Sequence, residues 1–142
     1  MAAQQRDTAY SETPLAKKLG ILTARDDPRE IALIAAPDHF IPQLGELPPG
    51  VRFRKSLSPG TALAIIFIRT LADLERALDL LETKLPPKAS AWVIRPKSHH
   101  KPGFNENDVR NSALARGLVD YKICSVDADW SGIKFAWRKS SS

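Results

Sequence analysis

Hydrophobic and polar segments follow one another in a pattern that predicts alternating β-strands and α-helices. Mainly apolar runs at 31–36, 62–68 and 89–94 are typical of strands buried on both faces of a parallel sheet. A shorter run at 51–55, after the turn-forming residues 48–50, predicts one further strand. Strands that alternate with helices in this way indicate a parallel sheet with right-handed crossovers.

Leucines at helical spacing predict the longest helix, which follows the strand at 62–68. Thr70 is a good N-cap, and Pro86 and Pro87 end the helix. We expect one face of the helix to pack on the sheet through Leu71, Leu74, Leu78, Leu81 and Leu85.

Shorter helices are expected at 13–20, 38–44 and 105–117. Asn105 can cap the last of these, and Phe104 and Val109 would form its hydrophobic staple. Beyond this helix, apolar residues alternate with polar ones in two stretches, and the turn-forming residues 127–132 separate them. This pattern predicts an antiparallel hairpin. The alternating apolar residues are Val119, Tyr121 and Ile123, then Ile133, Phe135 and Trp137.

These patterns predict a single Rossmann-like α/β domain of three layers over residues 13–138. Its sheet should be mostly parallel and end in the C-terminal antiparallel hairpin. Residues 1–12 and 139–142 lack apolar periodicity, so we expect them to be flexible. The length of 142 residues suits one core, and a hydrophobic share of 43% is that of an ordinary globular protein.

Cellular location and partner class follow from apolar runs, cysteine content and charge. No apolar run approaches the roughly 20 residues that cross a bilayer, and the first ten residues hold no signal-peptide core. We therefore expect a cytoplasmic protein without a membrane partner. The single cysteine, Cys124, cannot form an intramolecular disulfide, and the net charge of +5 favours an anionic partner.

Residues 10–21 read YSETPLAKKLGI, and residues 117–132 read GLVDYKICSVDADWSG. These two segments resemble the beginning and the end of an uncharacterised bacterial family, domain of unknown function 3052. The resemblance implies bacterial origin and a Rossmann-like fold. It names no substrate.

The closing helix, strand, turn and antiparallel strand resemble the end of the class I methyltransferases, and the chain as a whole resembles a truncated member of that fold. The resemblance implies that the closing strand lies beside the fourth strand. Those enzymes hold S-adenosylmethionine (SAM) with a glycine-rich turn after the first strand and usually an acidic residue after the second. Here residues 35–40 contain no glycine, and Arg54 and Lys55 end the second strand, where they cannot accept hydrogen bonds from ribose hydroxyls.

Polar residues gather where the predicted strands end, and ligands of open α/β sheets bind at that edge. Such a basic edge could bind an anionic small molecule or nucleotide, although long basic side chains also simply solvate a rim. In the hairpin turn, Trp130 could equally stack on a base or cap the core. The candidate ligand-binding residues are Asp38, His39, Lys55, Arg69, Thr70, Arg95, Lys97, His99, His100, Asp127 and Trp130.

Neither a metal site nor a catalytic residue is expected. Neighbouring histidines in a loop rarely converge, so His99 and His100 are not expected to form a site with His39. Cys124 should be a small buried residue rather than a nucleophile, since it lies in a strand.

The preferred interpretation is therefore a non-catalytic or degenerate Rossmann-like domain that binds an anionic small molecule or nucleotide. No cofactor is predicted by name. One alternative is a divergent SAM-dependent methyltransferase. Another is a nucleic-acid or protein interaction module, and phosphate-driven binding to nucleic acid would weaken steeply with salt.

The methyltransferase-like strand order also predicts which loops meet at the edge of the sheet where the parallel strands end. It brings the basic loop 95–101 against the acidic hairpin turn. Asp127 or Asp129 would then pair with Arg95 or Lys97.

Overall fold

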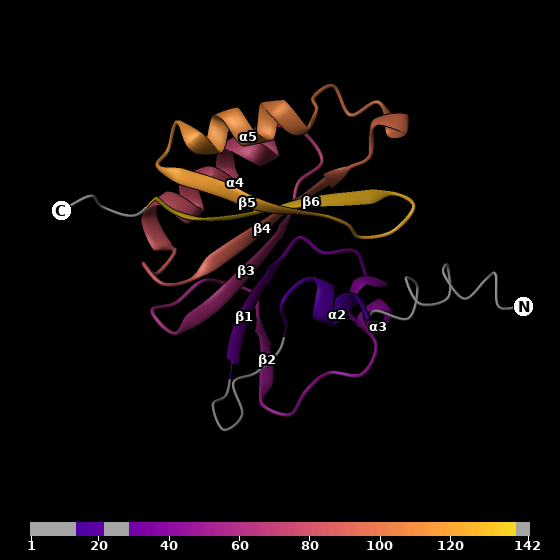
Figure 1. Ribbon diagram of the computed structural model, residues 1–142, viewed down its shortest axis with the longest axis vertical. Coiled ribbons are helices and arrows are strands. Elements are labelled where there is room, and N and C mark those ends of the chain that lie inside the picture. Colours follow the sequence, from indigo (N-terminus) through magenta and orange to yellow (C-terminus); the bar gives the residue numbers. More distant parts are fainter. Residues whose placement is uncertain (1–13, 22–28, 139–142) are drawn as a thin grey trace, which may run out of the picture.

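The computed structural model describes residues 14–21 and 29–138, and its strands form one six-stranded sheet in the order β2-β1-β3-β4-β6-β5 (Figure 1). The parallel strands are β1 (Arg29–Ile34), β2 (Val51–Arg54), β3 (Thr61–Phe67) and β4 (Ser90–Pro96). Strand β6 (Trp130–Trp137) runs antiparallel between β4 and the edge strand β5 (Leu118–Ser125). The predicted Rossmann-like fold is confirmed, including the position of the closing strand beside the fourth.

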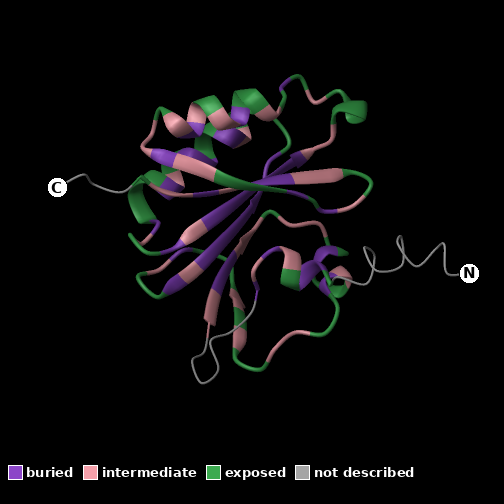
Figure 2. Cartoon of the chain, in the orientation of Figure 1, coloured by how far each residue is buried: buried purple, intermediate pink, exposed green. Residues whose placement is uncertain are grey.

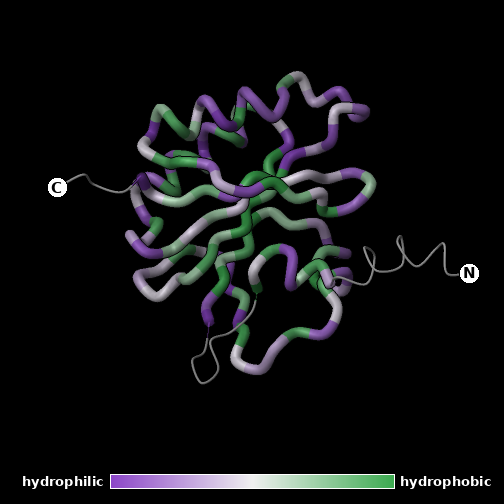
Figure 3. The backbone as a smooth tube through the Cα atoms, viewed as in Figure 1, coloured by the Kyte–Doolittle hydropathy of each residue, from purple (hydrophilic) through white to green (hydrophobic). Residues whose placement is uncertain are grey.

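Helices cover both faces of the sheet and complete the three layers (Figure 1). One face carries α4 (Leu71–Lys84) and α5 (Glu106–Leu114), and the other carries the short α2 (Leu15–Lys18) and α3 (Phe40–Leu44). A 3₁₀ turn, η1 (Ser98–His100), follows β4. Buried residues concentrate along the central strands (Figure 2), which are also the most hydrophobic part of the chain (Figure 3).

The helix boundaries follow the caps that the sequence contains. Asn105 forms a capping box with Asp108 at the start of α5, and Phe104 and Val109 are both buried beneath it, as a hydrophobic staple requires. Thr13, which the sequence places at the start of the opening helix, lies outside the described residues, and Pro14 is the observed N-cap of α2. The expectations for residues 1–12 and 139–142 also lie outside the described residues.

The leucine stripe of α4 is confirmed except at its first position. Leu74, Leu78 and Leu81 are fully buried against the sheet, and Leu85 is buried just beyond the helix. Leu71 is 50% exposed. It is the first residue of the helix and lies one turn before the buried stripe begins, so helical spacing alone assigned it to the wrong face.

Strand β5 also differs from its predicted alternation. Tyr121 and Ile123 are 55% and 49% exposed, whereas Leu118 and Cys124 are buried. An irregularity in the pairing with β6 after Asp120 shifts the register, and such a shift moves later side chains to the opposite face. Cys124 is buried as predicted, and burial raises the pKa of its thiol.

Within the described residues, no helix is long and apolar enough to cross a membrane.

Candidate functional site

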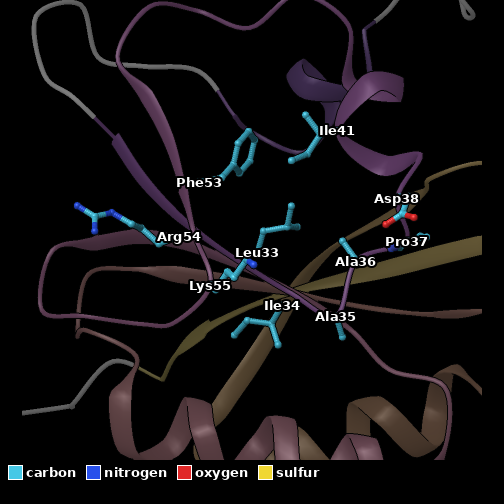
Figure 4. Close-up of a pocket in the computed structure, with 10 residues that line it drawn as sticks. All are labelled: Leu33, Ile34, Ala35, Ala36, Pro37, Asp38, Ile41, Phe53, Arg54 and Lys55. Atoms are coloured by element: carbon cyan, nitrogen blue, oxygen red, sulfur yellow. The ribbon is translucent and has the colours of Figure 1, made fainter.

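A cleft of about 500 Å³ lies beyond the carboxyl ends of β1 and β2 (Figure 4). Its walls are mainly apolar and include Leu33, Phe53 and Ile41, which come from three different elements. Asp38 and Lys55 also line it. Ligand pockets are typically about 300 to 1,000 Å³, with apolar walls and few polar groups, so this cleft is suited to a small molecule.

Ala35, one of the residues that line the cleft, has an uncommon backbone conformation. Its φ of 61° lies in the left-handed region, which costs about 1 to 2 kcal/mol for an L-residue other than glycine. This turn ends β1 at Ile34, two residues earlier than the apolar run predicts. The chain thus makes, with an alanine, the kind of backbone turn that glycine otherwise supplies. Strained residues of this kind cluster at functional sites.

The two basic residues that end β2 do not act alike. The guanidinium of Arg54 pairs with the Glu30 carboxylate at 3.5 Å and extends away from the other lining side chains (Figure 4). Lys55 remains as a positive charge, and Asp38 lies across the cleft on the segment that follows β1 (Figure 4). The cleft therefore offers one cation and one carboxylate to a ligand.

Beside the cleft, the hairpin turn is joined to α3 through Asp127. The Asp127 carboxylate accepts a hydrogen bond from the Gln43 side chain at 2.9 Å and lies 3.7 Å from His39 Nε2. Burial raises the pKa of Asp127, but the hydrogen bonds from Gln43 and from the backbone N–H groups of Asp129 and Trp130, with His39 nearby, outweigh it and lower the pKa. Asp127 is therefore present as a carboxylate, and it holds the hairpin turn against α3.

Three aromatic side chains and one arginine cluster where β3 ends and β6 begins. Trp130 packs edge-on against Phe67, which in turn contacts Phe40, and the Arg69 guanidinium lies 5.2 Å from the Trp130 ring centroid. Trp130 is only partly buried. It therefore extends the apolar core to the surface, as one of its two predicted roles requires.

Thr70 has a structural role at this edge. Its hydroxyl accepts the Asp73 N–H at 3.0 Å, and the Asp73 carboxylate accepts the N–H groups of Arg69 and Thr70, which completes the capping box of α4. The hydrogen bond from the Arg69 backbone is the main cause that lowers the pKa of Asp73.

We expect Thr70→Ala to destabilise the protein by about 1 kcal/mol, because the Asp73 N–H loses its acceptor. Urea denaturation measures this change. Thr70→Ser keeps the hydroxyl and should retain most of the stability. A Thr70→Ala variant as stable as the parent would show that the cap contributes nothing.

The loop 95–101 and the hairpin turn meet as expected, but not through the expected pairs. Arg95 is buried, its guanidinium lies 3.8 Å from Glu106, and its Nε has no partner among the described residues. The Lys97 ammonium donates to Ser125 Oγ at 2.7 Å, while the Lys97 N–H donates to the Asp129 carbonyl at 2.8 Å. The predicted pairing of Asp127 or Asp129 with Arg95 or Lys97 side chains is therefore wrong, because each of the four side chains has another partner: Gln43 for Asp127, His100 for Asp129, Glu106 for Arg95 and Ser125 for Lys97.

His99 and His100 meet the hairpin turn at Asp129. His100 Nε2 lies 2.8 Å from Asp129 Oδ1, and His99 Nε2 lies 4.0 Å from the same oxygen. His39 lies beside Asp127 instead, so the structure brings His99 and His100 together with Asp129 and not with His39. Sequence reasoning also gave no weight to Ala35, Ile41 or Gln43, since small, apolar and amide residues carry no signal before the fold is known.

No protein-family model matches the chain, and no curated protein matches it. Solved structures do. A protein assigned to the type 11 methyltransferases from Sulfolobus solfataricus has a TM-score of 0.61 and 8% identity, over 93% of this chain and 94% of that one. A TehB-like SAM-dependent methyltransferase from Corynebacterium glutamicum has a TM-score of 0.54 and 11% identity, over 96% of both chains.

A third similar structure is LepI in complex with SAM, with a TM-score of 0.53 and 11% identity over 91% of this chain. The chain spans about half of LepI, 48% of its length. At these identities the likeness shows the fold alone, and the predicted methyltransferase-like fold is confirmed. Kinship with the domain of unknown function 3052 stays a prediction.

The preferred interpretation from the sequence, a non-catalytic or degenerate domain that binds an anionic small molecule or nucleotide, is wrong. It rested on the missing glycines and on the basic end of β2. The finding against it is that two neighbours similar over nearly the whole chain are named as methyltransferases, one of them as SAM-dependent. The left-handed turn at Ala35 also weakens the argument from missing glycine.

Proposed function

We propose that the chain is a divergent SAM-dependent methyltransferase that binds SAM in the cleft beyond β1 and β2. The observation that carries the proposal is the left-handed turn at Ala35, which lines that cleft. The methyltransferase-like fold supports it, because ligands of such sheets bind beyond the carboxyl ends of the strands.

The residues that line the cleft fit the chemical groups of SAM. Phe53 and Ile41 offer apolar walls to an adenine ring, and Lys55 offers a cation to the methionine carboxylate. Asp38 offers an acceptor to the ribose hydroxyls or to the ammonium group. This carboxylate follows β1, whereas the resemblance led us to look for it after β2.

When bound, SAM supplies a methyl group on a positively charged sulfur, open to attack by a nucleophile. The chain's own contribution would be to bind and orient this group and to exclude water from it. Asp127, held as a carboxylate beside His39, and the partly exposed Trp130 lie on the same edge of the sheet. They are the residues that we propose face the methyl acceptor.

We expect calorimetry to show saturable binding of SAM and of S-adenosylhomocysteine. Ile41→Ala should weaken this binding by about fivefold, since it removes apolar contact from one wall of the cleft. Ile123→Ala is the matched control: Ile123 is 49% exposed, close to the 41% of Ile41, but lies on β5 outside the cleft.

The proposal is wrong if neither compound binds at millimolar concentration. It is also wrong if Ile41→Ala and Ile123→Ala behave alike. Binding of nucleic acid that falls steeply with salt, without any binding of SAM, would instead favour an interaction module.

A further inference from the structure

We propose that His99, His100 and Asp129 form a binding site for a divalent transition-metal ion, of which Zn²⁺ is the best-suited example. The three residues come from two loops at the far end of the ligand edge, and none of them lines the cleft beyond β1 and β2. The site is therefore independent of the proposed SAM site.

The ligand atoms are already close to the arrangement that a metal requires. One ligand atom from each of the three residues lies within 4.8 Å of the other two. Ligands about 2.0 Å from a tetrahedral ion are about 3.3 Å apart. The two contacts to Asp129 Oδ1, at 2.8 Å from His100 and 4.0 Å from His99, lie on either side of that separation. Small side-chain rotations would equalise them.

The backbone holds the two loops together before any metal binds. The Lys97 N–H donates to the Asp129 carbonyl at 2.8 Å, and the Asp129 N–H donates to Asp127 Oδ1 at 2.8 Å. The two histidines follow one another in η1, with ring centroids 4.2 Å apart. Metal binding would thus order few additional groups, and this lowers its entropic cost.

The chemistry of the ligands selects the class of metal. Two imidazoles and one carboxylate suit Zn²⁺, Cu²⁺ or Ni²⁺, whereas Mg²⁺ and Ca²⁺ prefer oxygen ligands alone. The Asp129 carboxylate would offset part of the charge of the ion. The Lys97 ammonium, whose charge would repel a cation, does not compete for the Asp129 carboxylate, since it donates to Ser125 Oγ. All three ligands are exposed, so the ion has free access and water can complete its coordination.

Titration of the tag-free full chain with Co²⁺ tests the site, since tetrahedral Co²⁺ absorbs visible light strongly and Zn²⁺ does not. We expect one Co²⁺ per chain, displaced by one Zn²⁺. The variants His99→Ala, His100→Ala and Asp129→Asn should each weaken binding at least tenfold. The control is His39→Ala, because His39 is the only other histidine of the chain and lies beside Asp127 instead.

The proposal is overturned if Co²⁺ and Zn²⁺ show no saturable binding at millimolar concentration. It is equally overturned if the double variant His99→Ala with His100→Ala binds as the parent does, or if His39→Ala abolishes binding. Circular dichroism of each variant shows whether it is folded, and Asp129→Asn, which preserves side-chain size and both backbone hydrogen bonds of Asp129, serves if a histidine variant is not.

Discussion

Trp92→Ala should destabilise the protein by about 3 to 5 kcal/mol, the usual cost of removing a large aromatic side chain from a core. Trp92 is fully buried at the centre of β4, and its indole N–H donates to the Leu19 carbonyl at 2.8 Å. The indole ring packs closely on Gly132, because a Cβ added to that glycine would lie only 3.1 Å from a ring carbon of Trp92. The substitution would therefore leave a cavity beside Gly132. It would also leave a buried carbonyl without its donor.

The free energy of unfolding in urea measures this effect. A loss of 5 kcal/mol is comparable to the whole stability of many domains, so Trp92→Phe provides a second, milder variant that loses mainly the hydrogen bond. Trp137→Ala is the matched control, because Trp137 also donates to a carbonyl, that of Leu85, but is only partly buried. If Trp92→Ala costs no more than Trp137→Ala, the described packing around β4 is wrong.

Leu78→Ala should cost about 2 to 5 kcal/mol through lost burial and a residual cavity. Leu78 is fully buried in the middle of α4, among the side chains that join the helix to the sheet. The chain provides its own control in the same helix. Leu71→Ala replaces the same side chain at a position that is 50% exposed, where changes usually stay within about 0.5 kcal/mol.

Denaturation of these two variants separates the structure from the sequence pattern. The pattern places both leucines on the packed face, whereas the structure places only Leu78 there. Equal losses would support the pattern. A loss confined to Leu78→Ala would support the structure.

The order of the elements could be predicted because the chain carries strong local signals for it. The buried run at 62–68 and the capped, leucine-striped helix that starts after Thr70 have few alternative interpretations. The predictions of strand boundaries and of buried faces were wrong where pairing between strands distant in the sequence determines them. The register irregularity in β5 turns Tyr121 and Ile123 outward, and only the partner strand reveals it.

The candidate site could be predicted in position but not in detail. The strand ends marked the edge of the sheet at which the cleft lies, because parallel strands deliver their carboxyl ends to the same side. The contacts of Asp127 with Gln43 and of Asp129 with His100 join residues 84 and 29 positions apart, which no local pattern encodes. Ala35 was missed because its left-handed backbone comes from the surrounding structure and not from a preference of alanine.

A nuclear magnetic resonance titration of the ¹⁵N-labelled chain with S-adenosylhomocysteine tests whether SAM binds beyond β1 and β2, as we propose. We expect the largest amide shifts on residues 33–38 and 53–55 and on Ile41, with Ala35 among them, because these residues line the cleft. Amides of η1 and of the exposed strand β5 should shift little. Shifts that cluster away from these residues, or no shifts at millimolar ligand, would show that SAM does not bind in this cleft.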